Sequence, residues 1–218
     1  MTQLAFEVTD IRPQQYAAAP HLMFHLRVTE DSGERVHAIA LRCQLRIEPQ
    51  RRAYNLDERE GLADMFGTPD RYATTLKPFL WTYATAMVQG FEWMTEFDLP
   101  VAVSYDVNVS GSKYLHALRG GAMPLCLLFS GTVFTRGETG FAVEQLSWSL
   151  ESRCQLPVET WHDLMDLYFP GSGWIRLERE TIDALAREKA AHGFTTWDQT
   201  LLELLPATEP TSDAIWAT

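Results

Sequence analysis

The sequence predicts an α+β fold built on a mostly antiparallel sheet or sandwich of about six strands. Segments that alternate apolar and polar residues gather in the first two thirds of the chain, and helical patterns with capping residues gather in the last third. Strands that are grouped together, and are not interleaved with helices, favour antiparallel pairing. A helical insertion is predicted after the third strand.

The segment Val36–Glu48 has the clearest strand pattern. Five apolar side chains take alternate positions: Ile39, Leu41, Cys43, Leu45 and Ile47. Because successive side chains of a strand point to opposite faces, these five are predicted to enter a core. The positions between them present Arg42 and Arg46 to solvent, and Arg51 and Arg52 follow the strand.

Two strands are predicted before this one, at Leu4–Arg12 and Leu22–Thr29. After it, Asn55 and Glu58 have the spacing of a capping box, in which the two side chains bind backbone N–H groups at the start of a helix. A short helix is therefore predicted to open the insertion.

Residues 70–97 are rich in aromatic side chains and show no clean period. They are predicted to form a partly helical or irregular excursion that covers the sheet. The aromatic cluster of this stretch contains Phe79, Trp81, Tyr83, Phe91, Trp93 and Phe97. Two interpretations stay open: a small core over one face of the sheet, or an exposed apolar patch for a partner protein.

Strand patterns return at Phe97–Val109, where VAVSYDVNV alternates. A hairpin is predicted next, with strands Leu125–Thr135 and Phe141–Glu151 joined by the short polar link Arg136–Gly140. The two glycines of this link suit the positive φ angles that hairpin loops need.

The last third of the chain is predicted to be helical. The segments are Val158–Tyr168, Glu178–His192 and Thr196–Leu205, and Gly193 has the usual place of a residue that ends a helix. We expect residues 1–206 to form a single α+β domain, followed by a flexible acidic tail over residues 207–218.

The distribution of charge argues against several classes of partner. Residues 1–54 carry seven Arg and six Asp or Glu, whereas residues 55–218 carry 11 Lys or Arg against 23 Asp or Glu. A chain with a net charge of −11 repels nucleic acid and anionic lipid over most of its surface. A nucleic-acid partner is therefore not expected.

The lack of a secretory pattern at Met1–Thr9 and the settings of the three cysteines predict a cytoplasmic location. Met1–Thr9 lacks the pattern of a secretory signal, and no window has the roughly eighteen apolar residues that cross a bilayer, so no membrane insertion is expected. Cys43, Cys126 and Cys154 stand in apolar or strand-like settings without CxxC spacing. Buried free thiols are therefore predicted, and a single disulfide with one odd thiol is the alternative.

Motifs for catalysis or cofactor binding are weak. His162 and Asp166 lie four residues apart on a predicted helix and share a face, but two ligands do not complete a metal site. His21 and His25 have the same spacing on a predicted strand. We expect no catalytic residue, metal or cofactor. The alternative is an enzyme or a metal- or cofactor-delivery protein, with a site assembled from these four distant residues.

Several phrases of the sequence resemble a bacterial family of unknown function whose members are single-domain proteins of about this length. The phrases are IALRCQLRIEPQRRAY, LKPFLWTYATAMVQGF, DLPVAVSYDVNVSGSKYLHAL, PLCLLFSGTVFTRGETGFAVEQLSW and YFPGSGWIRL. Genes of that family often lie beside genes for high-affinity, oxygen-tolerant nickel–iron hydrogenases, so the resemblance implies an accessory, assembly or interaction role. The segment LKPFLWTYATAMVQGF with DLPVAVSYDV is also similar to the SecB export chaperone.

These observations favour a non-catalytic accessory protein that binds a protein partner, with hydrogenase subunits as the partner that the resemblance implies. The candidate binding residues are Arg42, Arg46, Arg51, Arg52, Phe79, Trp81, Tyr83, Phe91 and Trp93. The arginines have two interpretations: they balance acidic helices of their own chain, or they receive an acidic partner or a second copy of the chain. A purely structural homo-oligomer is a further alternative.

Overall fold

The computed structural model describes residues 2–104, 110–137, 140–172 and 175–205. The chain divides into two compact units, Met1–Ile175 and Arg176–Thr218. The end of the strand predicted over 97–109 and the whole tail predicted over 207–218 lie outside the described residues.

The first unit contains two antiparallel sheets. The three-stranded sheet has the order β1 (Leu4–Pro13), β2 (His21–Glu30) and β5 (Met94–Ala102). The five-stranded sheet has the order β4 (Phe79–Phe91), β3 (Val36–Ile47), β6 (Ala122–Gly137) and β7 (Gly140–Gln145), and β8 (Glu151–Pro157) pairs with another part of β6. The predicted α+β class and antiparallel pairing are confirmed, and the described residues contain eight strands in place of about six.

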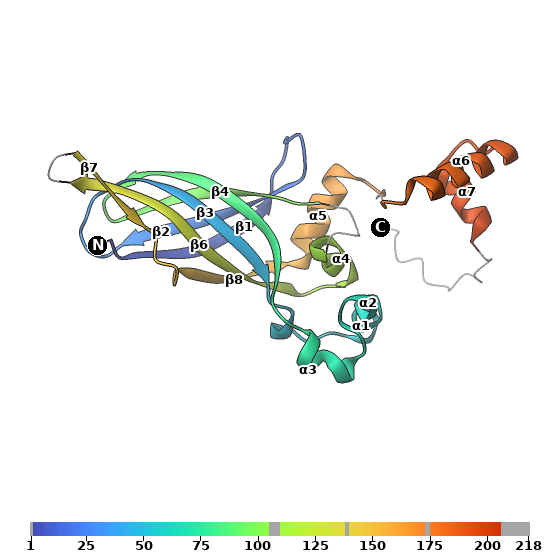
Figure 1. Cartoon of the computed structure of the whole chain (residues 1–218), viewed down its shortest axis with the longest axis horizontal. Coiled ribbons are helices and arrows are strands. Elements are labelled where there is room, and N and C mark those ends of the chain that lie inside the picture. Colours follow the sequence, from blue (N-terminus) through green and yellow to red (C-terminus); the bar gives the residue numbers. More distant parts are fainter. Residues whose placement is uncertain (1, 105–109, 138–139, 173–174, 206–218) are drawn as a thin grey trace. The chain divides into compact units, whose positions relative to one another are not determined.

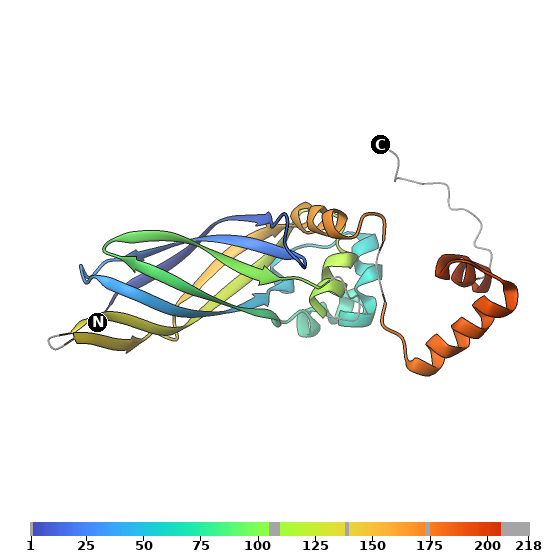
Figure 2. The ribbon, with the colours of Figure 1, turned by 90° about the horizontal axis from the view of Figure 1, so that it is seen from above.

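The core lies between the two sheets, which form the layers seen in Figure 2. The five alternating residues of β3, from Ile39 to Ile47, are buried as predicted. On β2 a similar row is fully buried: Leu22, Phe24, Leu26 and Val28. Phe6 of β1 stacks on Phe129 of β6 with ring centroids 4.3 Å apart, so aromatic contact joins the layers.

Helices close one end of the sandwich in the first unit (Figure 1). The insertion between β3 and β4 contains 3-10 helices η1 (Pro49–Arg51) and η2 (Pro69–Arg71) with α1 (Leu56–Gly61), α2 (Ala63–Phe66) and α3 (Tyr72–Thr75). Helices α4 (Ser110–Ala117) and α5 (Val158–Tyr168) also belong to this end. The helical insertion and the capping box of Asn55 and Glu58 are confirmed.

A buried ion pair ties the insertion to the sandwich. Arg52 Nη2 donates to Glu58 Oε1 at 2.7 Å, and the two side chains are only 11% and 3% exposed. Arg52 also donates to the carbonyl oxygens of Gly120 and Ala122, at the start of β6. Glu58 accepts from the backbone N–H of Arg119 at 3.0 Å. Each buried charge therefore has several partners, the condition under which burial of an ion pair is tolerated.

Two phenols extend this polar centre. Tyr54 Oη donates to the carbonyl of Pro49 at 2.7 Å and lies 2.7 Å from Tyr114 Oη. Burial raises the pKa of Tyr114 to about 12, and burial raises the pKa of Tyr54 as well. Both hydroxyls stay protonated at neutral pH, so they act as hydrogen-bonding groups that align α4 with the insertion.

The prediction for residues 70–97 was wrong in its main part. Only η2 and α3 are helical, and β4 and the start of β5 occupy the rest. The inward row of β4 contains small residues such as Ala84 and Ala86, while Tyr83 and Met87 point outward. In this part of β4, large side chains therefore lie on the solvent face and small ones on the core face. The sequence then lacks the alternation of polar and large apolar residues by which a strand is usually identified.

The hairpin prediction was confirmed for β6 and β7, but the second predicted strand ends early. After Gln145 the chain leaves the sheet, and it returns at Glu151 to pair with the first half of β6 as β8. The strand β8 was missed because polar residues occupy most of its positions.

The second unit contains α6 (Arg179–His192) and α7 (Trp197–Leu204). Gly193 ends α6 with a left-handed φ of 66°, and Thr196 with Gln199 forms the capping box of α7. Both helices match the prediction within one residue. Their exposed apolar side chains are Ile182, Trp197, Leu201, Leu202 and Leu204. In the described parts of the chain, no helix has the length and apolar character needed to span a membrane.

We predict that Arg52→Ala lowers the free energy of unfolding by about 3–5 kcal/mol, because Glu58 would remain buried without its cation. The neighbouring Arg51 is a matched control: it is 51% exposed and lies 3.6 Å from Glu48. Arg51→Ala should cost about 1 kcal/mol or less. Urea unfolding of both variants measures the difference, and equal costs would contradict the role given to Arg52.

A second buried carboxylate fixes the turn between β2 and β3. Glu30 is 1% exposed and accepts from the backbone N–H groups of Gln3, Ser32 and Gly33 at 2.8–3.0 Å, and from Ser32 Oγ. Burial acts to raise the pKa of Glu30, but these hydrogen bonds together lower it below its ordinary value of 4.5.

A carboxylate whose folded pKa is lowered stabilises the fold above its unfolded pKa, and this contribution disappears as the pH falls through the folded pKa. We therefore predict that Glu30→Gln is less stable than the natural chain at neutral pH, and that the gap narrows below about pH 4.5. Urea unfolding across pH measures the gap. Asp31→Asn, which removes one carboxylate charge at an exposed neighbour, is the matched control.

Candidate protein-binding surface

The solvent-facing side of the five-stranded sheet, called the outer face below, carries the predicted arginines of β3. Because the row from Ile39 to Ile47 points into the core, the intervening residues point outward. The register places Gln44 opposite Tyr83 and Arg42 opposite Thr85. Tyr83 and Thr85 of β4 therefore share this face with Arg42.

A cation–π contact organises the arginine side of the outer face. The guanidinium carbon of Arg42 lies 4.5 Å from the ring centroid of Tyr83, which is 48% exposed. Arg46 is half-buried and donates to the carbonyl of Pro78 at 3.4 Å. Among the described residues, neither arginine forms an ion pair within 4.0 Å. The contact, worth roughly 0.5–1 kcal/mol at an exposed site, restrains the side chains of Arg42 and Tyr83.

The other two predicted arginines do not join this face. Arg51 lies on η1 beside Glu48, and Arg52 is buried with Glu58. For these two residues the structure matches the interpretation that they balance acidic groups of their own chain. Four of the five N–H donors of the Arg52 guanidinium bind acceptors of its own chain, so at most one donor is left for a partner in this conformation.

Three of the five predicted aromatic residues point into the protein. Phe79 packs against Phe66 and Tyr114 with ring centroids 6.3 and 5.9 Å apart, and Phe91 is 7% exposed. Trp81 is half-buried against α4, where a Cβ at Gly111 would overlap its ring. Trp93, in contrast, is 70% exposed at the turn between β4 and β5. The stretch is thus part core and part surface.

The sequence alone did not identify the apolar side of the outer face. Met87 is 67% exposed and lies opposite Ala40, while Val143 is 61% exposed and lies opposite Phe134. Ala38, opposite Phe134 on its other side, completes this group. The outer face therefore combines an arginine–tyrosine side with an apolar side, and only the strand register brings the two together.

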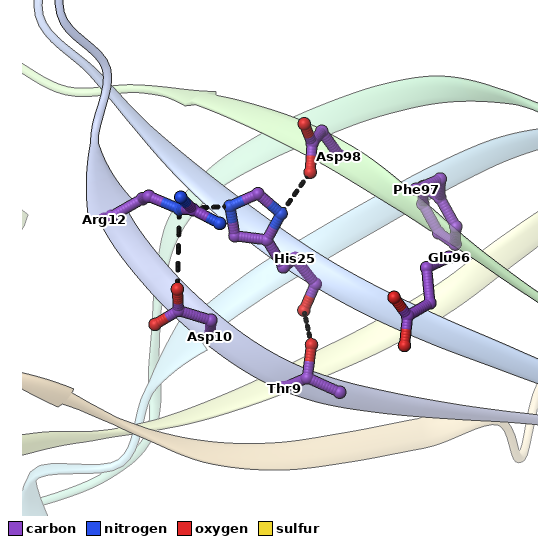
Figure 3. A pocket seen from close by; sticks show the side chains of 7 residues that line it. All are labelled: Thr9, Asp10, Arg12, His25, Glu96, Phe97 and Asp98. Carbon is purple, nitrogen blue, oxygen red and sulfur yellow. Dashed lines mark hydrogen bonds and ion pairs between the residues drawn. The ribbon is translucent and has the colours of Figure 1, made fainter.

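A polar hollow of about 390 Å³ lies on the three-stranded sheet (Figure 3). The register aligns Asp10, His25 and Asp98 on neighbouring strands. His25 Nδ1 is paired with Asp98, and His25 Nε2 accepts from Arg12 Nε at 2.6 Å. Arg12 Nε also lies 3.4 Å from Asp10. Because both ring nitrogens are engaged, neither is free to act as a base or a metal ligand in this conformation.

The four residues of the alternative delivery site are not gathered. His21 and His25 lie on β2, and His162 and Asp166 lie on α5. Within the described part of the chain, no three His, Cys, Asp or Glu side chains form a group able to hold a metal ion. His21, His25, His162 and Asp166 therefore do not form a metal site in this conformation.

The cysteines match the prediction of free thiols. Cys43 and Cys126 are buried and Cys154 is half-buried. Burial raises the pKa of Cys43 and of Cys154 to about 12, and burial together with Glu151 raises the pKa of Cys126. These thiols are poor nucleophiles at neutral pH, because only the thiolate form is reactive.

Comparison with solved structures finds remote likenesses. A late embryogenesis abundant protein is 11% identical over 71% of each chain with a TM-score of 0.34. A β-glucosidase from Kluyveromyces marxianus is 6% identical, over 72% of this chain and 15% of the enzyme, with a TM-score of 0.26. AggA, the major subunit of an Escherichia coli fimbria, is 12% identical over 72% and 94%, also at 0.26. Scores this low establish no shared function.

We predict that Trp81→Ala lowers the free energy of unfolding by about 2 kcal/mol, less than the 3–5 kcal/mol for a fully buried aromatic residue, because Trp81 is half-buried against α4. Trp93→Ala removes the same side chain from an exposed turn and should cost about 0.5 kcal/mol or less. Urea unfolding distinguishes the two. A large cost at Trp93 would show that it also packs within the fold.

Comparison of the sequence with curated proteins finds no match. A family model described as a family of unknown function, DUF6084, matches residues 1–213. This confirms the expected membership in a family of unknown function. The chain belongs to the family DUF6084.

Proposed function

We propose that this chain is a non-catalytic accessory protein that binds a protein partner through its outer face. The observation that carries the proposal is the exposed Tyr83 under the guanidinium of Arg42, on the same face as the exposed Met87 and Val143. Tyrosine, arginine and methionine are enriched in protein interfaces, and tyrosine and arginine dominate their hot spots.

Electrostatics supports an acidic patch on the partner. The chain has a net charge of −11, yet Arg42 and Arg46 present two cations on this face without ion pairs among the described residues. A local cationic surface on an acidic protein directs encounter toward one orientation and repels other approaches. The apolar side then supplies contact area that the partner buries.

The partner is proposed to be a subunit of a nickel–iron hydrogenase. The support is the resemblance of the sequence to a family whose genes often lie beside hydrogenase genes. In this proposal the chain acts in hydrogenase assembly or function, as a chaperone or a scaffold, and its own residues perform no chemical step.

The test is a pull-down of hydrogenase subunits from native lysate with the full chain. We expect the natural chain to recover them and Arg42→Glu with Tyr83→Ala to bind at least about tenfold more weakly, since hot-spot losses reach 2 kcal/mol or more. Arg35→Glu is the matched control, because Arg35 is 65% exposed and lies just before β3.

Two results would count against the proposal. Failure of the natural chain to recover any hydrogenase subunit would remove the proposed partner. Equal losses in Arg35→Glu and in the double variant would remove the outer face as the binding site, because a general charge effect would then explain the loss.

A further inference from the structure

The strand β4 is an open edge of the five-stranded sheet. It pairs with β3 on one side, and no described strand pairs with it on the other. The ladder with β3 is regular from Thr82 to Gln89, after an irregularity at Trp81. β5 lies close to part of β4, but no described strand pairs with the outward backbone N–H and C=O groups of β4, which leaves them open to a further strand.

This edge lacks charged residues and prolines, two of the devices by which proteins protect exposed strands. The other outer strands carry charged residues: Glu7, Asp10 and Arg12 on β1, Glu96 and Asp98 on β5, Glu144 on β7, and Glu151 and Arg153 on β8. Prolines also occur in β1, β5 and β8. The thirteen residues of β4, FLWTYATAMVQGF, include neither a charged residue nor a proline. Charge and proline are the usual means of preventing strand addition.

We propose that β4 pairs with β4 of a second copy of this chain, antiparallel across a two-fold axis. In such an interface the same surface patch meets itself, so a charged residue near the axis would face its own charge. Two chains of net charge −11 repel each other over most of their surfaces. At the uncharged edge of β4, two copies meet without this repulsion. A strand that binds a charged segment of another protein would carry residues of the opposite charge, and β4 carries none.

The side chains of β4 fit this pairing. A two-fold axis near Thr85 places Tyr83 of one copy opposite Met87 of the partner subunit. Both side chains are large, and they are 48% and 67% exposed in the single chain. Pairing of an aromatic with a long apolar side chain across antiparallel strands is a stabilising contact, and the new ladder satisfies the open backbone groups.

The pairing goes beyond the proposed function and has a consequence for it. Two five-stranded sheets would join through β4 into one continuous sheet. The Arg42–Tyr83 contact of each copy would then lie near the axis, and a partner protein would meet two copies of the outer face side by side.

The first test is the mass of the full chain in solution, measured by sedimentation equilibrium over a wide concentration range. We expect twice 24.8 kDa for the natural chain, and Thr85→Lys should halve it by opposing two like charges at the axis. Ser130→Lys is the control, because Ser130 is exposed on the same face but lies on the central strand β6. It should leave the doubled mass intact.

The outcomes separate the possibilities. A single-chain mass at all concentrations overturns the pairing, and so does a doubled mass that survives Thr85→Lys. Dissociation by Ser130→Lys as well as by Thr85→Lys also overturns it, because the copies would then associate face to face. A single-chain mass combined with recovery of hydrogenase subunits would leave the proposed function standing while the pairing fails.

Cross-linking tests the geometry directly. Thr85→Cys places two thiols opposite each other at the axis, where opposite Cβ atoms lie about 4.5–5.5 Å apart, and the double substitution Tyr83→Cys with Met87→Cys places each new thiol opposite the other one of the partner subunit. We expect both variants to form an interchain disulfide under mild oxidation, and Ser130→Cys to form none. Absence of a cross-link in both variants overturns the proposed axis.

Discussion

The burial of one row of side chains on β3 decides the position of most other features of the first unit. This strand pairs with β4 on one side and β6 on the other, so its register sets which residues of both neighbours face the core. Because the row from Ile39 to Ile47 points inward, Arg42 points outward. The ring centroid of Tyr83, which lies opposite Gln44, is then 4.5 Å from the guanidinium carbon of Arg42. Core packing and the candidate binding surface are thus two results of a single alternation.

At the ends of the sandwich, polar contacts fix segments of the chain that apolar packing alone does not hold in place. Arg52 and Glu58 hold the insertion against the start of β6, and Glu30 holds the turn that leads into β3. In both places a carboxylate accepts several N–H groups, which satisfies its charge without water. These contacts orient the chain on either side of β3 and leave the outer face uncovered by the described elements of the first unit.

Much of the fold was predictable because its signals are local. The alternation of β3, the caps at Asn55 and Thr196, and Gly193 after α6 depend on residues a few positions apart. The candidate surface was predictable only in part. Arg42 and Arg52 look alike in the sequence, and only the tertiary contact with Glu58 separates a buried arginine from an exposed one. The apolar side, with Met87 and Val143, depends on the register of β3 with β4, of β3 with β6 and of β6 with β7, and the second of these joins strands that are far apart in the sequence.

The strand order also constrains how the chain folds. β2 pairs with β5, and β3 pairs with β6, so each sheet contains a pair of strands that lie many tens of residues apart in the sequence. Pairings between distant strands form slowly, because the entropy of closing the long loop is lost before any contact between the strands compensates for it. Until β6 is made, one edge of β3 has no native partner. During synthesis the uncharged β4 therefore emerges beside an unfinished sheet, the stage at which a molecular chaperone would matter most to this protein itself.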